Sequence, residues 1–165
     1  MCNKRWEFTG ETKICLGITL KRIRAVVEFK LKCGIVIKKG ELGGWIENES
    51  NLYGNAWVSG DACVYGDADV SGNARVSGNA CVYGDADVSG NADVKSSKDY
   101  CVYKNIWSSF RWFTYTKSNK MWSVGCFYGT GAELIAKAYK DSERSGKCYE
   151  AIVKAQEAIE KAMEV

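Results

Sequence analysis

The sequence predicts a mainly β protein whose middle is a left-handed parallel β-helix of about three coils, with an N-terminal β segment and a C-terminal α+β cap. Two observations predict it. An aliphatic residue, usually valine, recurs every sixth position from Ile46 to Val94. The string ACVYGDADVSGNA occurs at 62–74 and again, three hexads later, at 80–92. Six residues a side and three sides a coil give this longer period, which is typical of stacked repeats.

The sequence pattern of each hexad, V-x-G-[N/D]-A-x, has a physical reason. Alanine and valine alternate with outward residues, which is the period of a strand with one buried face. The glycine that follows supplies the positive φ angle of a tight corner. A collagen interpretation fails because glycine recurs every sixth residue and the chain has no proline. Calcium-binding nonapeptide repeats have the wrong period.

The pattern divides the chain into an N-terminal β cap (1–44), the β-helix (45–95) and a C-terminal module (96–165). Upstream, Ile23, Ala25, Val27 and Phe29 alternate with other residues, which predicts a strand over 19–29 with one buried face. Shorter strands are expected at 6–8 and 35–37. The GELGG segment at 40–44 then forms the turn that leads into the first coil.

Downstream, strands are expected at 100–107, 110–116 and 121–124, with a hairpin turn at Ser118-Asn-Lys. Thr130 and Glu133 have the spacing of a capping box, which predicts a helix that begins there and ends near Ser142. Apolar residues at three- and four-residue spacing predict a second, amphipathic helix over 147–163. This module would cover an open end of the coil, where unpaired backbone groups invite aggregation.

Three stretches outside the repeat carry a resemblance to a known group. They are LKRIRAV at 20–26, VIKKGELGGWIENESNL at 36–52 and VGCFYGT at 124–130. With the repeat, they make the chain resemble the hexapeptide-repeat proteins, and more narrowly the YdcK-like bacterial and prophage proteins. The resemblance implies a homotrimer, since trimers are common in this group, and it suggests a phage or prophage origin.

Composition narrows the classes of protein. Hydrophobic residues make up 46% and charged residues 26% of the 165, as in soluble folded domains. No apolar run approaches the roughly 20 residues that cross a bilayer, and the N-terminus lacks the apolar stretch of a secretory signal. A cytoplasmic protein that does not bind a membrane is therefore expected.

The eight cysteines show no CxxC spacing, and the chain has no histidine. Reduced thiols that act as small hydrophobic residues are expected, without a metal site or cofactor. The charges are uneven: residues 46–94 hold one arginine against eight acidic residues, and both flanks are basic. With this acidic middle, nucleic-acid binding is not expected.

Residues separated by three hexads should stack, which sorts the outward side chains of the repeat into three faces. The first face is apolar, so we expect it to be a subunit interface or the surface on which the C-terminal helices dock. Its residues are Trp45, Cys63, Tyr65, Cys81 and Tyr83.

The other two faces carry polar residues. The second places the carboxylates of Asp69 and Asp87 about 4.8 Å apart on neighbouring strands, where solvation is expected and a cation is the alternative. On the third, Trp57 stacks above Arg75, a candidate cation–π pair that is either structural or holds a flat ligand.

Catalysis is not expected. Many hexapeptide-repeat acyltransferases use a histidine base, and carbonic anhydrases built on the same fold bind zinc through histidines, so the absence of histidine argues against both. A carboxylate base would need burial, and a cysteine nucleophile would lack a histidine to activate it. A degenerate acyltransferase-like protein remains as an alternative to the two binding hypotheses that follow.

Two binding hypotheses remain. In the first, the protein docks on or blocks a macromolecular partner, and the resemblance to prophage proteins suggests a host-defence protein. In the second, aromatic and basic residues sequester a small nucleotide signal; the alternative is that most of these aromatics form the core of the C-terminal module. The candidate ligand-binding residues are Arg22, Arg24, Trp57, Arg75, Trp107, Arg111, Trp112 and Lys120.

Overall fold

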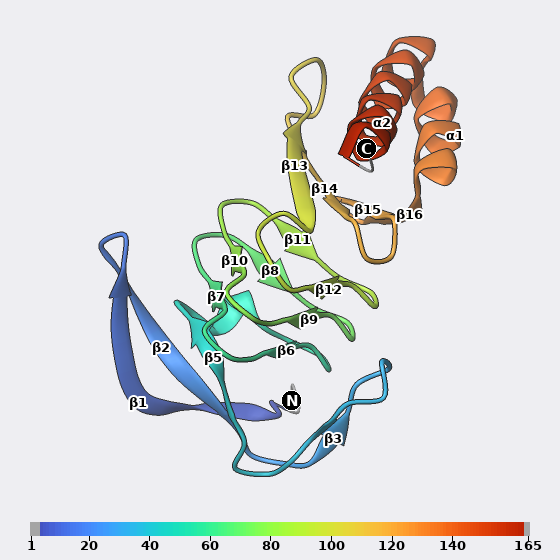
Figure 1. Ribbon diagram of the computed structural model, residues 1–165. Helices are drawn as coiled ribbons and strands as arrows, with labels where there is room; N and C mark the ends of the chain where they lie inside the picture. The colour runs from blue at the N-terminus through green and yellow to red at the C-terminus, as the bar shows by residue number, and fades with distance from the viewer. Residues whose placement is uncertain (1–3, 164–165) are drawn as a thin grey trace.

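An antiparallel hairpin begins the chain in the computed structural model, which describes residues 4–163. Strands β1 (Trp6–Cys15) and β2 (Ile18–Ala25) form this hairpin, and β2 pairs antiparallel with β5 (Leu42–Ile46). Between them, β3 (Phe29–Lys30) and β4 (Val36–Ile37) form a separate small sheet. Figure 1 shows the β1–β2 hairpin extending past the edge of the repeat region, which we define as residues 46–94.

The repeat region consists of very short strands that pair in parallel, each with the strand three hexads further along the chain. The paired strands form three rows. In the first row Trp45 lies beside Cys63 and Cys63 beside Cys81, and the other two rows follow the same register. A short 3₁₀ helix, η1 (Glu49–Asn51), precedes the second row. The strands are β6 (Trp57–Val58), β7 (Cys63–Val64), β8 (Asp69–Val70), β9 (Arg75–Val76), β10 (Cys81–Val82), β11 (Asp87–Val88) and β12 (Asp93–Val94).

One side chain in every six fills the interior of the repeat region. Each of the seven valines from Val58 to Val94 that recur every sixth position is fully buried, and the alanines of the motif are buried beside them. Backbone N–H groups donate to carbonyls of the neighbouring repeat in the same row, as from Cys63 to Ala80 at 2.9 Å. The predicted interior positions are therefore confirmed.

The fold class predicted from the sequence is nevertheless wrong. In place of one left-handed β-helix with a cap at each end, residues 4–163 form five small sheets of mixed orientation and two helices. Two sheets contain only parallel repeat strands, whereas the sheet of β5, β7 and β10 continues into the antiparallel hairpin. Because the repeat strands are so short, parallel pairing is confined to short ladders, and the longest strands, β1 and β2, are antiparallel.

The C-terminal module is a four-stranded antiparallel sheet covered by two helices (Figure 1). Its strands run in the order of the chain, and Phe113, Trp122, Leu134 and Val153 form its core. Its elements are β13 (Tyr100–Lys104), β14 (Trp112–Thr116), β15 (Met121–Val124), β16 (Phe127–Thr130), α1 (Gly131–Asp141) and α2 (Glu143–Met163). No helix in this described stretch is both long and apolar enough to span a membrane.

Most local predictions for this module agree with the structure. The side chain of Thr130 accepts from the N–H of Glu133, as the capping box predicts, and α1 ends before Ser142. The second helix begins one turn earlier than predicted, and β15 has the predicted bounds. In the N-terminal segment, β2 stops at Ala25, so Val27 is exposed and the predicted strand to Phe29 is too long.

Hydroxyl groups of the C-terminal module cover the open end of the repeat region. The last strands of the three rows have no further repeat to receive their N–H groups. The N–H of Cys81 donates to Ser97 Oγ at 3.1 Å. Those of Asp87 and Asp93 donate to Thr114 Oγ1 and Ser118 Oγ, both at 2.8 Å. The end of each row is thus satisfied by a side chain, as buried backbone donors require.

Replacing Thr114 by valine should therefore destabilise the protein. Valine has the same shape but leaves the Asp87 N–H without an acceptor, and Thr114 is buried, so the free energy of unfolding should fall by about 1–2 kcal/mol. Urea denaturation measures this change. Ser97→Ala is the control, because the exposed N–H of Cys81 regains water and should cost under about 0.5 kcal/mol. Equal losses in the two variants would contradict this role for Thr114.

Candidate functional site

The predicted ligand residues of β2 are engaged by glutamates of β1. Arg22 Nη1 lies 3.1 Å from Glu11 Oε2, and Arg24 pairs with Glu7. The Arg22 guanidinium also lies over the Trp45 ring, 5.4 Å from its centroid. These arginines join the strands of the hairpin and do not face the other predicted ligand residues.

Trp57 and Arg75 do not form the predicted ligand platform. Trp57 is fully buried and packs edge-on against Phe29, with ring centroids 5.7 Å apart. Its indole Nε1 has no hydrogen-bond partner among the described residues. Arg75 Nη1 lies 3.6 Å from Asp93 Oδ1. The predicted register of Trp57 beside Arg75 is confirmed, but Trp57 is not exposed, because the β3–β4 segment brings Phe29 over it.

The four predicted ligand residues of the C-terminal module point to different places. Trp107 belongs to the core, where it contacts Phe113 and Tyr149. Arg111 lines a small cavity beside α1, and Lys120 lines a larger one beneath α2. Trp112 is partly exposed, with Lys104 Nζ 4.8 Å from its ring centroid. The structure thus does not bring the predicted nucleotide site together.

The apolar first face is covered by the N-terminal hairpin. Leu20 is buried against Cys63 and Tyr65, and Cys15 and Ile18 pack beside them with Trp45 and Cys81. Of the predicted interface residues only Tyr83 is largely exposed, and its ring stacks on that of Tyr65 at 5.3 Å. The prediction that the C-terminal helices dock on this face is wrong, since β1 and β2 occupy it.

The carboxylates of the second face contact their neighbours. The hydroxyl of Ser123 on β15 donates to Asp87, whose own N–H is bound by Thr114. Burial, and then the adjacent carboxylate of Asp87, raise the pKa of Asp69 above its usual value. No group of three or more Cys, Asp or Glu side chains within residues 4–163 is arranged to hold a metal ion.

The segment between β13 and β14, residues 105–111, is an ordered loop organised by one buried side chain. Asn105 Oδ1 accepts from the backbone N–H groups of Trp107 and Ser108, each at 3.0 Å. Its amide nitrogen donates to the hydroxyls of Ser108 and Ser109, at 2.9 and 3.2 Å. Asn105 itself is fully buried. With the Trp107 indole packed in the core, the loop is fixed at both its start and its middle.

This loop, which we call the display loop, presents two large apolar side chains to solvent. Ile106 is 76% exposed and Phe110 is 64% exposed. Phe110 also has a φ of +54°, a left-handed conformation that aromatic residues rarely adopt. Sequence reasoning assigned Phe110 to a strand and missed the loop. The sequence feature that indicates this loop is Asn105 followed by serines three and four residues later, a pattern of side-chain-stabilised turns.

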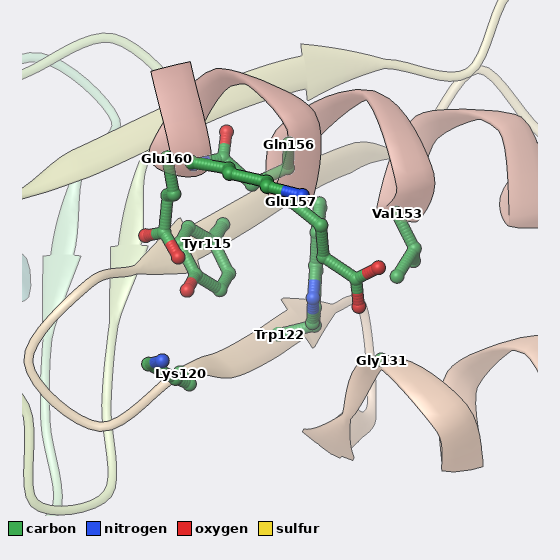
Figure 2. A pocket seen from close by; sticks show the side chains of 9 residues that line it. Tyr115, Lys120, Trp122, Gly131, Val153, Gln156, Glu157 and Glu160 are labelled. Carbon is green, nitrogen blue, oxygen red and sulfur yellow. The ribbon is translucent and has the colours of Figure 1, made fainter. Parts of the chain in front are cut away.

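A pocket of about 500 Å³ lies between the C-terminal sheet and α2 (Figure 2). Tyr115 and Trp122 form its floor, with ring centroids 4.9 Å apart. Helix α2 supplies its roof, and Lys120 comes from the turn between β14 and β15. The lining residues are Tyr115, Lys120, Trp122, Gly131, Val153, Gln156, Glu157, Glu160 and Lys161.

Polar groups around the pocket are only partly paired. Tyr103 donates its hydroxyl to Gln156 Oε1 at 2.6 Å. Burial, and then a hydrogen bond of the Tyr115 hydroxyl with the Glu160 carboxylate, raise the pKa of Tyr115 far above its usual value. Figure 2 shows Glu160 reaching down from α2 beside Tyr115. One oxygen of Glu160, Oε1, is shielded from solvent without a hydrogen-bond partner in the described chain. An unpaired buried acceptor of this kind is uncommon in native proteins.

Comparisons with models of protein families, with curated proteins and with solved structures find no match to this chain. Its function therefore has to be inferred from its own residues. The display loop and the pocket beneath α2 are two features with arrangements that packing alone does not explain. One exposes apolar groups on a rigid support, and the other leaves a carboxylate oxygen unpaired.

Proposed function

We propose that the protein is a non-catalytic binding protein that docks on a macromolecular partner through the display loop. The order of the loop, with Ile106 and Phe110 exposed on it, carries this proposal. An ordinary aromatic residue in the left-handed region costs about 1–2 kcal/mol. Strain of this kind persists where the surroundings impose it, and it concentrates at functional sites.

Rigid display favours a protein partner over a flexible or small ligand. A loop already held by Asn105 and Trp107 loses little conformational entropy when a partner buries its side chains. Lys104 precedes the loop on β13, and Arg111 is the last residue of the loop, just before β14. The complementary surface is an apolar socket with an acidic rim on another protein.

The setting of this activity is part of the proposal. The protein would act in the cytoplasm, where the seven cysteines of residues 4–163 that are present as free thiols would stay reduced. By covering the socket, it would block that surface of its partner. A host-defence protein is the partner class that the resemblance to prophage proteins suggests.

The other two candidate functions have less support. Nucleotide sequestration would need the predicted basic and aromatic residues to converge, and they lie in separate places. The pocket beneath α2, which has an aromatic floor, carries two glutamates, which repel phosphate. An acyltransferase would need a base in place of the absent histidine. Burial raises the pKa of one candidate, Asp69, which stands beside Asp87. Asp69, however, lines neither of the two cavities described above.

A double variant, Ile106→Ser with Phe110→Asn, tests the proposal. Asparagine tolerates a left-handed φ, so the loop should keep its shape and the protein its stability while the apolar display is removed. Each protein would serve as bait in source-cell extract, with mass spectrometry of what is retained. We expect a partner retained by the original protein to fall at least tenfold with the double variant.

A matched control is available in the same molecule. The tip of the β1–β2 hairpin exposes Ile14 (78%) and Leu16 (85%), and Leu16 has a φ of +51°. Ile14→Ser with Leu16→Asn therefore removes a comparable exposed apolar surface from a second left-handed position. This control should retain the partner. If the partner is lost with the hairpin variant and kept with the loop variant, the display loop is not the docking site.

A further inference from the structure

The pocket beneath α2 combines an aromatic floor with two carboxylates. Trp122 packs between Tyr115 and Tyr103, with ring centroids 4.9 and 5.9 Å away. Glu157 and Glu160 approach this floor from α2, and Figure 2 shows both side chains directed at it. Aromatic faces and carboxylates are the two groups that attract an organic cation.

The pairing of charges along α2 sets this pocket apart. Three Glu–Lys pairs on the helix have the spacing of four residues that favours an ion pair. Glu143–Lys147 and Glu150–Lys154 are paired, at 2.8 and 2.5 Å. Glu157 and Lys161 are not within ion-pair distance in the described structure, although both line the pocket. Of these three pairs, only the one at the pocket, Glu157 and Lys161, does not form an ion pair in the described structure.

Glu160 adds a second, independent observation. Its Oε1 is shielded from solvent without a hydrogen-bond partner in the described part of the chain, although Lys120 and Lys161 line the same pocket. A buried carboxylate oxygen is stabilised by a donor, and best by a charged one. Neither lysine is within ion-pair distance of Glu160 in the described structure, so neither pocket carboxylate has a cationic partner within this part of the chain.

We propose that this pocket binds an alkylammonium ion, whose alkyl chain lies over Tyr115 and Trp122 and whose charge is held by the carboxylates at the two ends of this floor, Glu160 beside Tyr115 and Glu157 beside Trp122 (Figure 2). The volume of about 500 Å³ lies within the range of small-ligand sites. The same chemistry is presented by a free diamine and by a lysine side chain of a peptide. This site is separate from the display loop and stands independently of the function proposed above.

Calorimetric titration of the full chain with 1,5-diaminopentane tests the proposal, and Nα-acetyl-lysine amide distinguishes a peptide source from a free diamine. A shift of the Trp122 indole N–H in nitrogen-15 spectra locates the binding. Glu160→Gln and Glu157→Gln, which keep the side-chain shape, should each weaken binding about tenfold. Lys120→Gln, which removes a competing cation from the pocket, should tighten it. The uncharged 1,5-pentanediol should not bind.

Three results would overturn the proposal. The first is no heat and no indole shift at about 10 mM ligand, roughly the weakest affinity that a specific site of this size would show. The second is binding that both glutamine variants leave unchanged. The third is inorganic phosphate binding that Lys120→Gln abolishes, which would mark the pocket as an anion site. Thermal unfolding of each variant, expected to match the original protein, separates loss of the site from loss of the fold.

Discussion

Replacing Gly72 by alanine should lower the free energy of unfolding by about 3 kcal/mol, the sum of a left-handed backbone and an overpacked contact. Gly72 has a φ of +67°, and an added Cβ would lie 2.9 Å from the backbone nitrogen of Gly90 and 3.1 Å from its oxygen. Neither backbone atom can move without disturbing the parallel ladder on either side. Urea denaturation followed by circular dichroism measures the loss.

Gly84 provides the control for this prediction. It occupies an equivalent corner with a φ of +68°, but an added Cβ would meet nothing within 4 Å. Gly84→Ala should therefore show only the conformational cost, about 1 kcal/mol. The difference between the two variants measures how tightly the repeats stack. If the losses are equal, stacking of corners contributes nothing and only the φ angle matters.

The repeat shows what a sequence pattern determines and what it does not. Valine every sixth residue marks which side chains are interior, and those from Val58 to Val94 are buried. The same pattern does not say which strands pair with the outermost repeat. That β5 is flanked by β2 on one side and β7 on the other depends on contacts between distant segments, so the predicted fold class was wrong although the interior was right.

Alternation likewise gives the side of a strand on which a residue lies, but not what covers that side. Cys63 and Tyr65 were correctly placed on one outward face, yet the hairpin that buries them comes from the start of the chain, well ahead of the repeat. Of the eight predicted ligand residues, only Lys120 lines the pocket beneath α2. The spacing of Glu157 and Lys161 is that of an ordinary surface ion pair. Only the placement of α2 on the sheet reveals that the carboxylates of Glu157 and Glu160 lack cationic partners in the described structure.

Trp57→Ala should give the largest loss of stability, about 4 kcal/mol, because truncating a fully buried tryptophan leaves a cavity that the structure fills only in part. Trp57 lies under Phe29, whose ring is 5.7 Å away, so the loss should also release the β3–β4 segment. Denaturation in urea gives the change in free energy. Hydrogen exchange at the amide of Leu31, which bonds Ile35 O at 2.8 Å, should report the release.

Trp57→Phe separates the packing of this side chain from its polarity. The indole Nε1 is buried without a partner among the described residues, and an unsatisfied buried donor costs about 1–3 kcal/mol. Phenylalanine removes that donor while keeping most of the apolar contact, so the two effects should nearly cancel and stability should change by less than about 1 kcal/mol. A loss as large as that of Trp57→Ala would contradict this account, because the contacts made only by the larger indole ring would then far outweigh the gain from removing its buried donor. A small loss would establish that Trp57 serves to pack the β3–β4 segment against the repeat region.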